Sequence, residues 1–310
     1  MHAADPAKVN AVLGEFAKSA VDNYGARAVY LFGSLIYRGG AQFIDSSDVD
    51  LVVVLPDLSH AIGRWRWLQL FSEWVSGLEV KLMRVLHRTG SEPSVSVVAV
   101  TEAELVCDVH KDGHREFFTA NVFRDLVTAA EAEGIPGAGV RSTDRFVAGA
   151  LSFTQKARND FLAVSANDTP RMTEFLGPDP LPKRVMRAAA MASRASGRTG
   201  GAGAEHDVQE GLDLLSNELY ARRDDDPAYR QLQDLVSVRR HARGTPRPVE
   251  PAQQLLLAEM IYDIASGASR LGSATGGGAG PAPADHPPSE AGAGVANANA
   301  ASAGDASPAQ

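Results

Sequence analysis

The chain has 310 residues, of which 44% are hydrophobic and 22% are charged, and these are the proportions of a globular protein. Its formal net charge of −8 argues against a broad basic surface for nucleic acid, so we expect a small-molecule or protein partner instead. A single cysteine excludes an intrachain disulfide, and no stretch reaches the roughly 20 apolar residues of a membrane span. The first residues lack the layout of a signal peptide, and these features together favour a cytoplasmic protein that contacts no membrane.

The first 110 residues combine apolar runs typical of strands with segments of helical spacing. Strands are predicted at 26–32, 48–55 and 94–100. Residues 7–21 repeat apolar side chains at helical spacing, which predicts a helix. Residues 61–87 begin with a helical pattern, but their second half, from Gly77, fits either a helix or a strand.

The pattern changes after residues 133–140, whose glycines and proline mark a domain boundary. Beyond it apolar residues recur at helical spacing, as in the stripe formed by Val208, Leu212, Leu215 and Leu219. Residues 271–310 have too few large apolar side chains to fold, so we expect them to be disordered. The predicted fold is therefore α+β, with a small mixed-sheet head over 1–135, a helical domain over 141–270 and this tail.

Two pairs of small or polar residues lie at the ends of the first two predicted strands that face each other along the chain. Gly33 and Ser34 end the first, whereas Asp48 and Asp50 open the second. Side chains two apart on a strand share a face, so the two carboxylates project together and repel each other unless a cation neutralises them. Hard oxygen ligands suit Mg²⁺, while a glycine turn with a hydroxyl and free backbone N–H groups can bind phosphate. This stretch therefore predicts a site for a metal ion and a nucleoside triphosphate.

A Gly-Ser turn followed by Asp-x-Asp on the next strand resembles the signature of the polymerase-β-like nucleotidyltransferase superfamily, over residues 10–110. The resemblance implies transfer of a nucleoside monophosphate from a nucleoside triphosphate (NTP), such as ATP, to a hydroxyl of a small molecule or protein. Mg²⁺ or Mn²⁺ would be the cofactor. Gly33 and Ser34 would bind the nucleotide, while Asp48 and Asp50 would hold two metal ions between the attacking and leaving oxygens.

The superfamily pattern also implies a third acid on a neighbouring strand, and here the sequence departs from it. The expected strand offers only Ser94 and Ser96 at its polar positions. Glu79 could serve as the third catalytic acid if its segment is a strand. Glu102 and Glu104 look instead like acids of a helix's first turn, where the helix dipole favours them.

Three basic residues are candidates for binding the triphosphate. Arg38 follows the Gly-Ser turn, and the alternative interpretation is an exposed loop residue. Lys183 and Arg187 lie at the start of a helix in the second domain, and basic residues of such a domain contact phosphates in superfamily members. A solvated helix face is the alternative interpretation for these two.

The sequence favours an enzyme but leaves a second class of function open. Without a third acid, the chain could be a catalytically degenerate member that binds nucleotide or neutralises a partner as an antitoxin does. The Gly-Ser and Asp-x-Asp pairs favour the enzyme, whereas Ser94 and Ser96 favour the binding module. No pattern in the sequence identifies the acceptor, the base preference or the oligomeric state.

Overall fold

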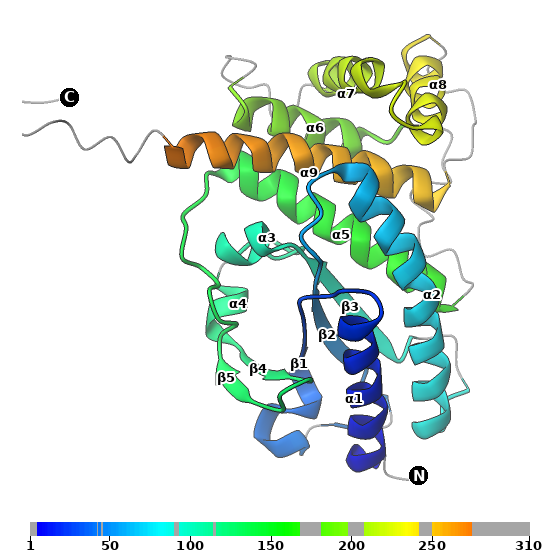
Figure 1. The fold of residues 1–310 in the computed structure, drawn as a ribbon, viewed down its shortest axis with the longest axis vertical. Helices are drawn as coiled ribbons and strands as arrows, with labels where there is room; N and C mark the ends of the chain where they lie inside the picture. Colours follow the sequence, from blue (N-terminus) through cyan, green and yellow to red (C-terminus); the bar gives the residue numbers. More distant parts are fainter. Residues whose placement is uncertain are drawn as a thin grey trace, which may run out of the picture. The chain divides into compact units, whose positions relative to one another are not determined.

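The computed structural model describes residues 5–41, 43–44, 46–89, 93–113, 116–167, 181–197, 208–241 and 250–274. All of them belong to one compact unit, Met1–Thr275. This unit combines a five-stranded mixed sheet with a helical second half, which confirms the predicted α+β class (Figure 1). Residues 271–274 of the predicted tail are the end of a helix, and 275–310 lie outside the described residues.

The sheet has the strand order β3-β2-β1-β4-β5. Its strands are β1 (Ala28–Phe32), β2 (Val49–Val54), β3 (Val95–Val100), β4 (Val122–Asp125) and β5 (Glu131–Glu133). β2 pairs with β1 in the antiparallel sense and with β3 in the parallel sense, while β4 is antiparallel to both β1 and β5. The three strands predicted from the sequence are confirmed, and β4 and β5 have no counterpart in that prediction.

Helices cover the sheet and build the second half of the unit. The first half contains α1 (Pro6–Asp22), α2 (Ala61–Val85), α3 (Glu102–Val106), α4 (Phe117–Ala120) and the 3-10 turns η1 (Gly33–Leu35) and η2 (Tyr37–Gly40). The second half contains α5 (Arg145–Asn167), α6 (Lys183–Ala195), α7 (Val208–Arg222), α8 (Pro227–His241) and α9 (Pro251–Ala274). α5 contacts both β3 and α9, and α6 contacts α9 and α7 (Figure 1). None of the described helices is long and apolar enough to cross a membrane.

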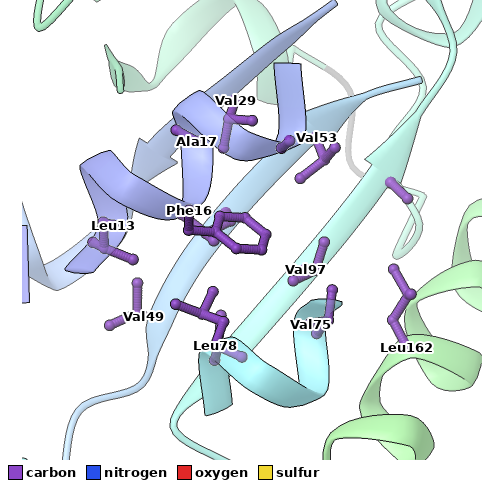
Figure 2. Close-up of a cluster of buried hydrophobic side chains, with 14 of the residues drawn as sticks. Leu13, Phe16, Ala17, Val29, Val49, Val53, Val75, Leu78, Val97 and Leu162 are labelled. Carbon is purple, nitrogen blue, oxygen red and sulfur yellow. The ribbon is translucent and has the colours of Figure 1, made fainter. Parts of the chain in front are cut away.

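The interior strand β2 is buried on both faces of the sheet. On one face, Val49 and Val53 belong to a cluster with Phe16 of α1 and Val75 of α2 (Figure 2). The alternate residue Val52 belongs to a second cluster on the other face. An apolar run without alternation is what a strand covered on both sides requires. A polar residue within this run, such as an aspartate, therefore needs a separate explanation.

The segment from Gly77, which the sequence leaves open, is helical up to Val85, so the strand alternative is wrong. Leu78 and Leu82 are buried at helical spacing. Val80 would share their face in a strand, but it is 45% exposed. The helix places Glu79, the candidate third acid, on α2 rather than in the sheet.

A buried network of charged side chains connects α9 to α2, α3 and α5. Glu259 of α9 accepts a hydrogen bond from Nε of Arg64 at 2.6 Å and another from Nε of Arg158 at 2.5 Å. Arg158 also donates to Glu104 at 2.7 Å, and Arg64 donates to Asp263. Burial alone would raise the pKa of Glu259, but the guanidinium groups of Arg158 and Arg64 hold it below its usual range. Each helix thus supplies a buried charge that the others neutralise.

Candidate active site

Gly33 forms the turn at the end of β1, and two constraints require glycine at this position. Its φ is +82°, in the left-handed region that favours glycine. A Cβ added here would also lie 2.5 Å from Oδ2 of Asp50. The backbone of the turn therefore lies against that carboxylate. Ser34 follows in η1 and is half-buried.

Asp50 lies in β2 between two neighbouring strands. In the register of the sheet it is opposite Phe32 of β1 and Ser96 of β3. Asp48 directly precedes the strand and is exposed, while Val49 between them is buried. This alternation puts the two aspartates on the face opposite to Val49. The structure thus brings Asp48 and Asp50 to the Gly33 turn.

The pKa of the Asp50 carboxyl is raised from an ordinary 3.8 to about 7. Burial is the largest cause, the negative charge of Asp48 is the second, and the ammonium group of Lys111 opposes both. The protein alone therefore stabilises the ionised form of Asp50 poorly. A divalent cation bound between the two aspartates would favour that ionised form.

Tyr37 and Asn121 extend the site beyond the Gly-Ser turn. The pKa of Tyr37 is raised by burial and by the charge of Asp50, so its ring lies within the electrostatic reach of that carboxylate. Its hydroxyl donates a hydrogen bond to Oδ1 of Asn121 at 2.9 Å. The amide of Asn121 donates in turn to the carbonyl oxygen of Phe117 at 2.8 Å, which fixes its orientation.

Lys111 is a cation at this site that the sequence analysis missed. Burial lowers its pKa, while the charges of Asp112 and Asp50 act in the opposite direction. Its Nζ donates to Oδ1 of Asn159 on α5 at 3.0 Å. Asn159 itself donates to the carbonyl oxygen of Val97 at 2.8 Å, on the free edge of β3. The ammonium group is thus held by a side chain that is anchored to the sheet.

The model of one protein family, described as a Pol beta superfamily nucleotidyltransferase in conflict systems, matches residues 15–266. This chain belongs to that family. A comparison with curated proteins found no match, and neither did a comparison with solved structures. Members of this nucleotidyltransferase family take an NTP as substrate, and nucleotidyltransferases of the superfamily generally use divalent metal ions.

The donor atoms at this candidate site fit a divalent cation. Asp48 and Asp50 offer hard carboxylate oxygens at the start of β2, and the raised pKa of Asp50 indicates that a positive charge there would be stabilising. Among the described residues, no group of three or more His, Cys, Asp or Glu side chains is placed to hold a metal ion. Asp48 and Asp50 are therefore a pair of candidate ligands, not a complete set of three.

The proposed third acid, Glu79, has another role in the structure. It is 1% exposed, and its two carboxylate oxygens accept hydrogen bonds from the backbone N–H groups of Ser94 at 2.7 Å and Val95 at 3.0 Å. It therefore holds the start of β3. Its catalytic role depended on a strand that the structure replaces with α2. Ser96, not an acid, is the residue of β3 opposite Asp50.

The three basic candidates lie on two separate elements. Arg38 is exposed in η2 and has a positive φ of 52°. Lys183 and Arg187 lie on α6, whose buried residues, among them Val185 and Met186, pack in the helical core. A role for these residues in nucleotide binding stays a prediction.

A cavity of about 680 Å³ adjoins the segment that carries Lys111. Its lining includes Asp108, Arg141, Arg145 and Ser152. The hydroxyl of Ser152 donates to the carbonyl oxygen of Lys111 at 2.9 Å, so this wall of the cavity contacts the backbone of the segment that carries Lys111. A second cavity, of about 430 Å³, lies at the other end of β2, beyond the carboxyl ends of β2 and β3.

Proposed function

We propose that this protein is a Mg²⁺-dependent nucleotidyltransferase that moves a nucleoside monophosphate from an NTP to a hydroxyl of a small molecule or a protein. The observation that carries the proposal is the packing of the Gly33 turn against Asp50, with Asp48 beside it. A glycine turn lets the backbone approach a phosphate closely, and two adjacent carboxylates suit the cation that accompanies it. Family membership agrees with this chemistry.

Each residue has a defined task in this proposal. Asp48 and Asp50 hold the cation, which supplies positive charge to the triphosphate when bound. The Gly33 turn and the Ser34 hydroxyl orient the phosphates. The acceptor oxygen then forms a bond to the α-phosphorus while the bond from that phosphorus to the bridging oxygen of the β-phosphate breaks. Pyrophosphate leaves, and the hydroxyl proton passes to solvent.

The cavity of about 680 Å³ is the proposed place for the part of the substrate that extends beyond the triphosphate. Its lining carries both acids and arginines, which suits a polar molecule better than an apolar one. The net charge of −8 argues against a nucleic acid as that molecule.

The test is incubation of the protein with each α-³²P-labelled NTP, Mg²⁺ or Mn²⁺, and a clarified cell lysate as a source of acceptors. The proposal predicts release of pyrophosphate and label in a new product, both abolished in Asp50→Asn. Asp57→Asn is the matched control, because Asp57 is an exposed aspartate just beyond the other end of β2. Equal label transfer by Asp50→Asn and the parent would contradict the proposal.

A second candidate is a nucleotide-binding module without turnover, which could act on a partner protein in a conflict system. Ser96 favours it, because a neutral residue lies on β3 where the superfamily pattern implies an acid. Binding of an NTP that depends on Asp50, with no pyrophosphate release for any base or cation, would support this candidate over the enzyme.

A further inference from the structure

Ser96 of β3 lies opposite Asp50 of β2, and of these two residues only Asp50 can carry a charge. The two residues are opposite each other in the parallel register, so their side chains share a face of the sheet. A carboxylate at 96 would join the aspartate pair and complete a site for two cations. A serine hydroxyl brings no negative charge to balance a second divalent ion.

Lys111 brings a positive charge to this same face. Its charge acts on Asp50, and its position is set by the hydrogen bonds from Lys111 to Asn159 and from Asn159 to the edge of β3 at Val97. Burial disfavours the charged form of this ammonium group, and the carboxylates of Asp112, Asp50 and Asp160 offset part of that cost. An anionic ligand at Asp48 and Asp50 would add to this compensation. A triphosphate is such an anion.

Charge counting links the two observations. Three carboxylates with two divalent cations leave one net positive charge facing the substrate. Two carboxylates with one divalent cation and one ammonium group leave the same net charge. An acid at position 96 and a second divalent cation would together add one positive charge to the site. The ammonium group of Lys111 adds the same charge.

We propose that Asp48 and Asp50 bind a single divalent cation and that Lys111 takes the place of the second cation against the phosphates. The inference rests on the proposed nucleotide site and states which groups supply the positive charge there. Lys111 contacts the nucleotide directly in this arrangement, whereas Asn159 is a positioning residue.

The test is equilibrium dialysis of the full chain with Mn²⁺ and the α,β-methylene analogue of each ribonucleoside triphosphate. It measures bound Mn²⁺ and bound analogue separately. The parent should bind one Mn²⁺ for each analogue. Lys111→Met should keep this ratio and weaken analogue binding by about tenfold or more, because a charge-assisted contact is lost. Lys81→Met is the control, since Lys81 pairs with Glu15 on the exposed surface of α1 and α2.

A double variant, Lys111→Met with Ser96→Asp, gives an independent measurement. It restores the three-acid arrangement, so it should bind two Mn²⁺ for each analogue. Two Mn²⁺ in the parent, unchanged analogue affinity in Lys111→Met, or a single Mn²⁺ in the double variant would each overturn the role of Lys111. Absence of any Mn²⁺-dependent analogue binding by the parent would overturn the nucleotide site itself, and the inference with it.

Discussion

Gly33 and Asp50 leave no space between them for a side chain at position 33, since an added Cβ would lie 2.5 Å from Oδ2 of the aspartate. Gly33→Ala should therefore displace the carboxylate and remove most of the thermal stabilisation that Mg²⁺ with NTP gives the parent. Gly25→Ala is the control, because Gly25 also has a positive φ but has no atom within 4 Å of the added Cβ. Both variants should lose about 1–2 kcal/mol of backbone stability. Only Gly33→Ala should lose the ligand response, and a full response in this variant would contradict the proposed contact.

Asp50→Asn separates binding from stability. The variant removes one of two adjacent negative charges while keeping the shape of the side chain, so without metal it should unfold at the same temperature as the parent or higher. Ligand that binds only the native state raises stability by RT ln(1 + [L]/Kd), and this gain should disappear. Thermal melts of both proteins, with and without Mg²⁺ and each NTP, measure the two effects. A purely structural Asp50 would give a lower melting temperature and no ligand shift in either protein.

The raised pKa of Asp50 predicts that the free energy of unfolding of the parent protein depends on pH. Its carboxyl titrates near 3.8 when unfolded and at about 7 when folded, so between these values the native state binds the extra proton. Stability linked to this group is therefore present at low pH and is lost as the pH rises toward 7. In urea unfolding with EDTA, the advantage of Asp50→Asn over the parent should be about 2–3 kcal/mol larger at pH 8 than at pH 5. An advantage independent of pH would show that Asp50 is solvated normally.

Glu259→Gln should destabilise the whole unit. It leaves Arg64 and Arg158 buried with less negative charge to neutralise them, which costs about 3–5 kcal/mol for a buried pair. Glu15→Gln is the control, because it breaks an exposed pair with Lys81 worth under about 1 kcal/mol. Urea unfolding of both variants tests the difference, and equal losses would mean that the network contributes no more than a surface pair.

Residues 275–310 should be dispensable for folding. They contain no Leu, Ile, Phe, Trp, Tyr or Met, so they can bury little apolar surface. A chain that ends at residue 274 should melt within about two degrees of the full chain, as expected for a free-energy change well below 1 kcal/mol. Loss of soluble protein on this deletion would show that the segment packs.

The parts of the site that the sequence predicts are those encoded within one short stretch. Gly33 directly follows β1, while Asp48 and Asp50 lie at the start of β2, the next strand along the chain. Because these two strands pair in the antiparallel sense, the end of one lies beside the start of the other. Lys111 and Asn159 reach the same place from a loop and from α5, and Tyr37 meets Asn121 across 84 residues of sequence. No local pattern reports such tertiary contacts.

The ambiguity of the segment around Glu79, which the structure resolves as a helix, has a simple physical origin. In the stretch around it, apolar Leu78, Val80 and Leu82 alternate with polar residues as in a strand, while Leu78 and Leu82 also fit one face of a helix. Only burial distinguishes the two, because Val80 is exposed whereas Leu78 and Leu82 are buried. The position of β4 and β5 was missed for a related reason, since strands of three or four residues are too short to show a period.

The partners in the buried charge network are far apart in the sequence, so they are synthesised at different times. Arg158 emerges from the ribosome 101 residues before Glu259, its partner on α9, and Arg64 emerges 195 residues before it. At about 5–20 residues per second, Arg158 waits about 5–20 s for this partner. During that interval, neither arginine can be buried with its full complement of charge. The helices α2 and α5 can thus bury these two arginines with their full set of charge partners only after α9 has been made.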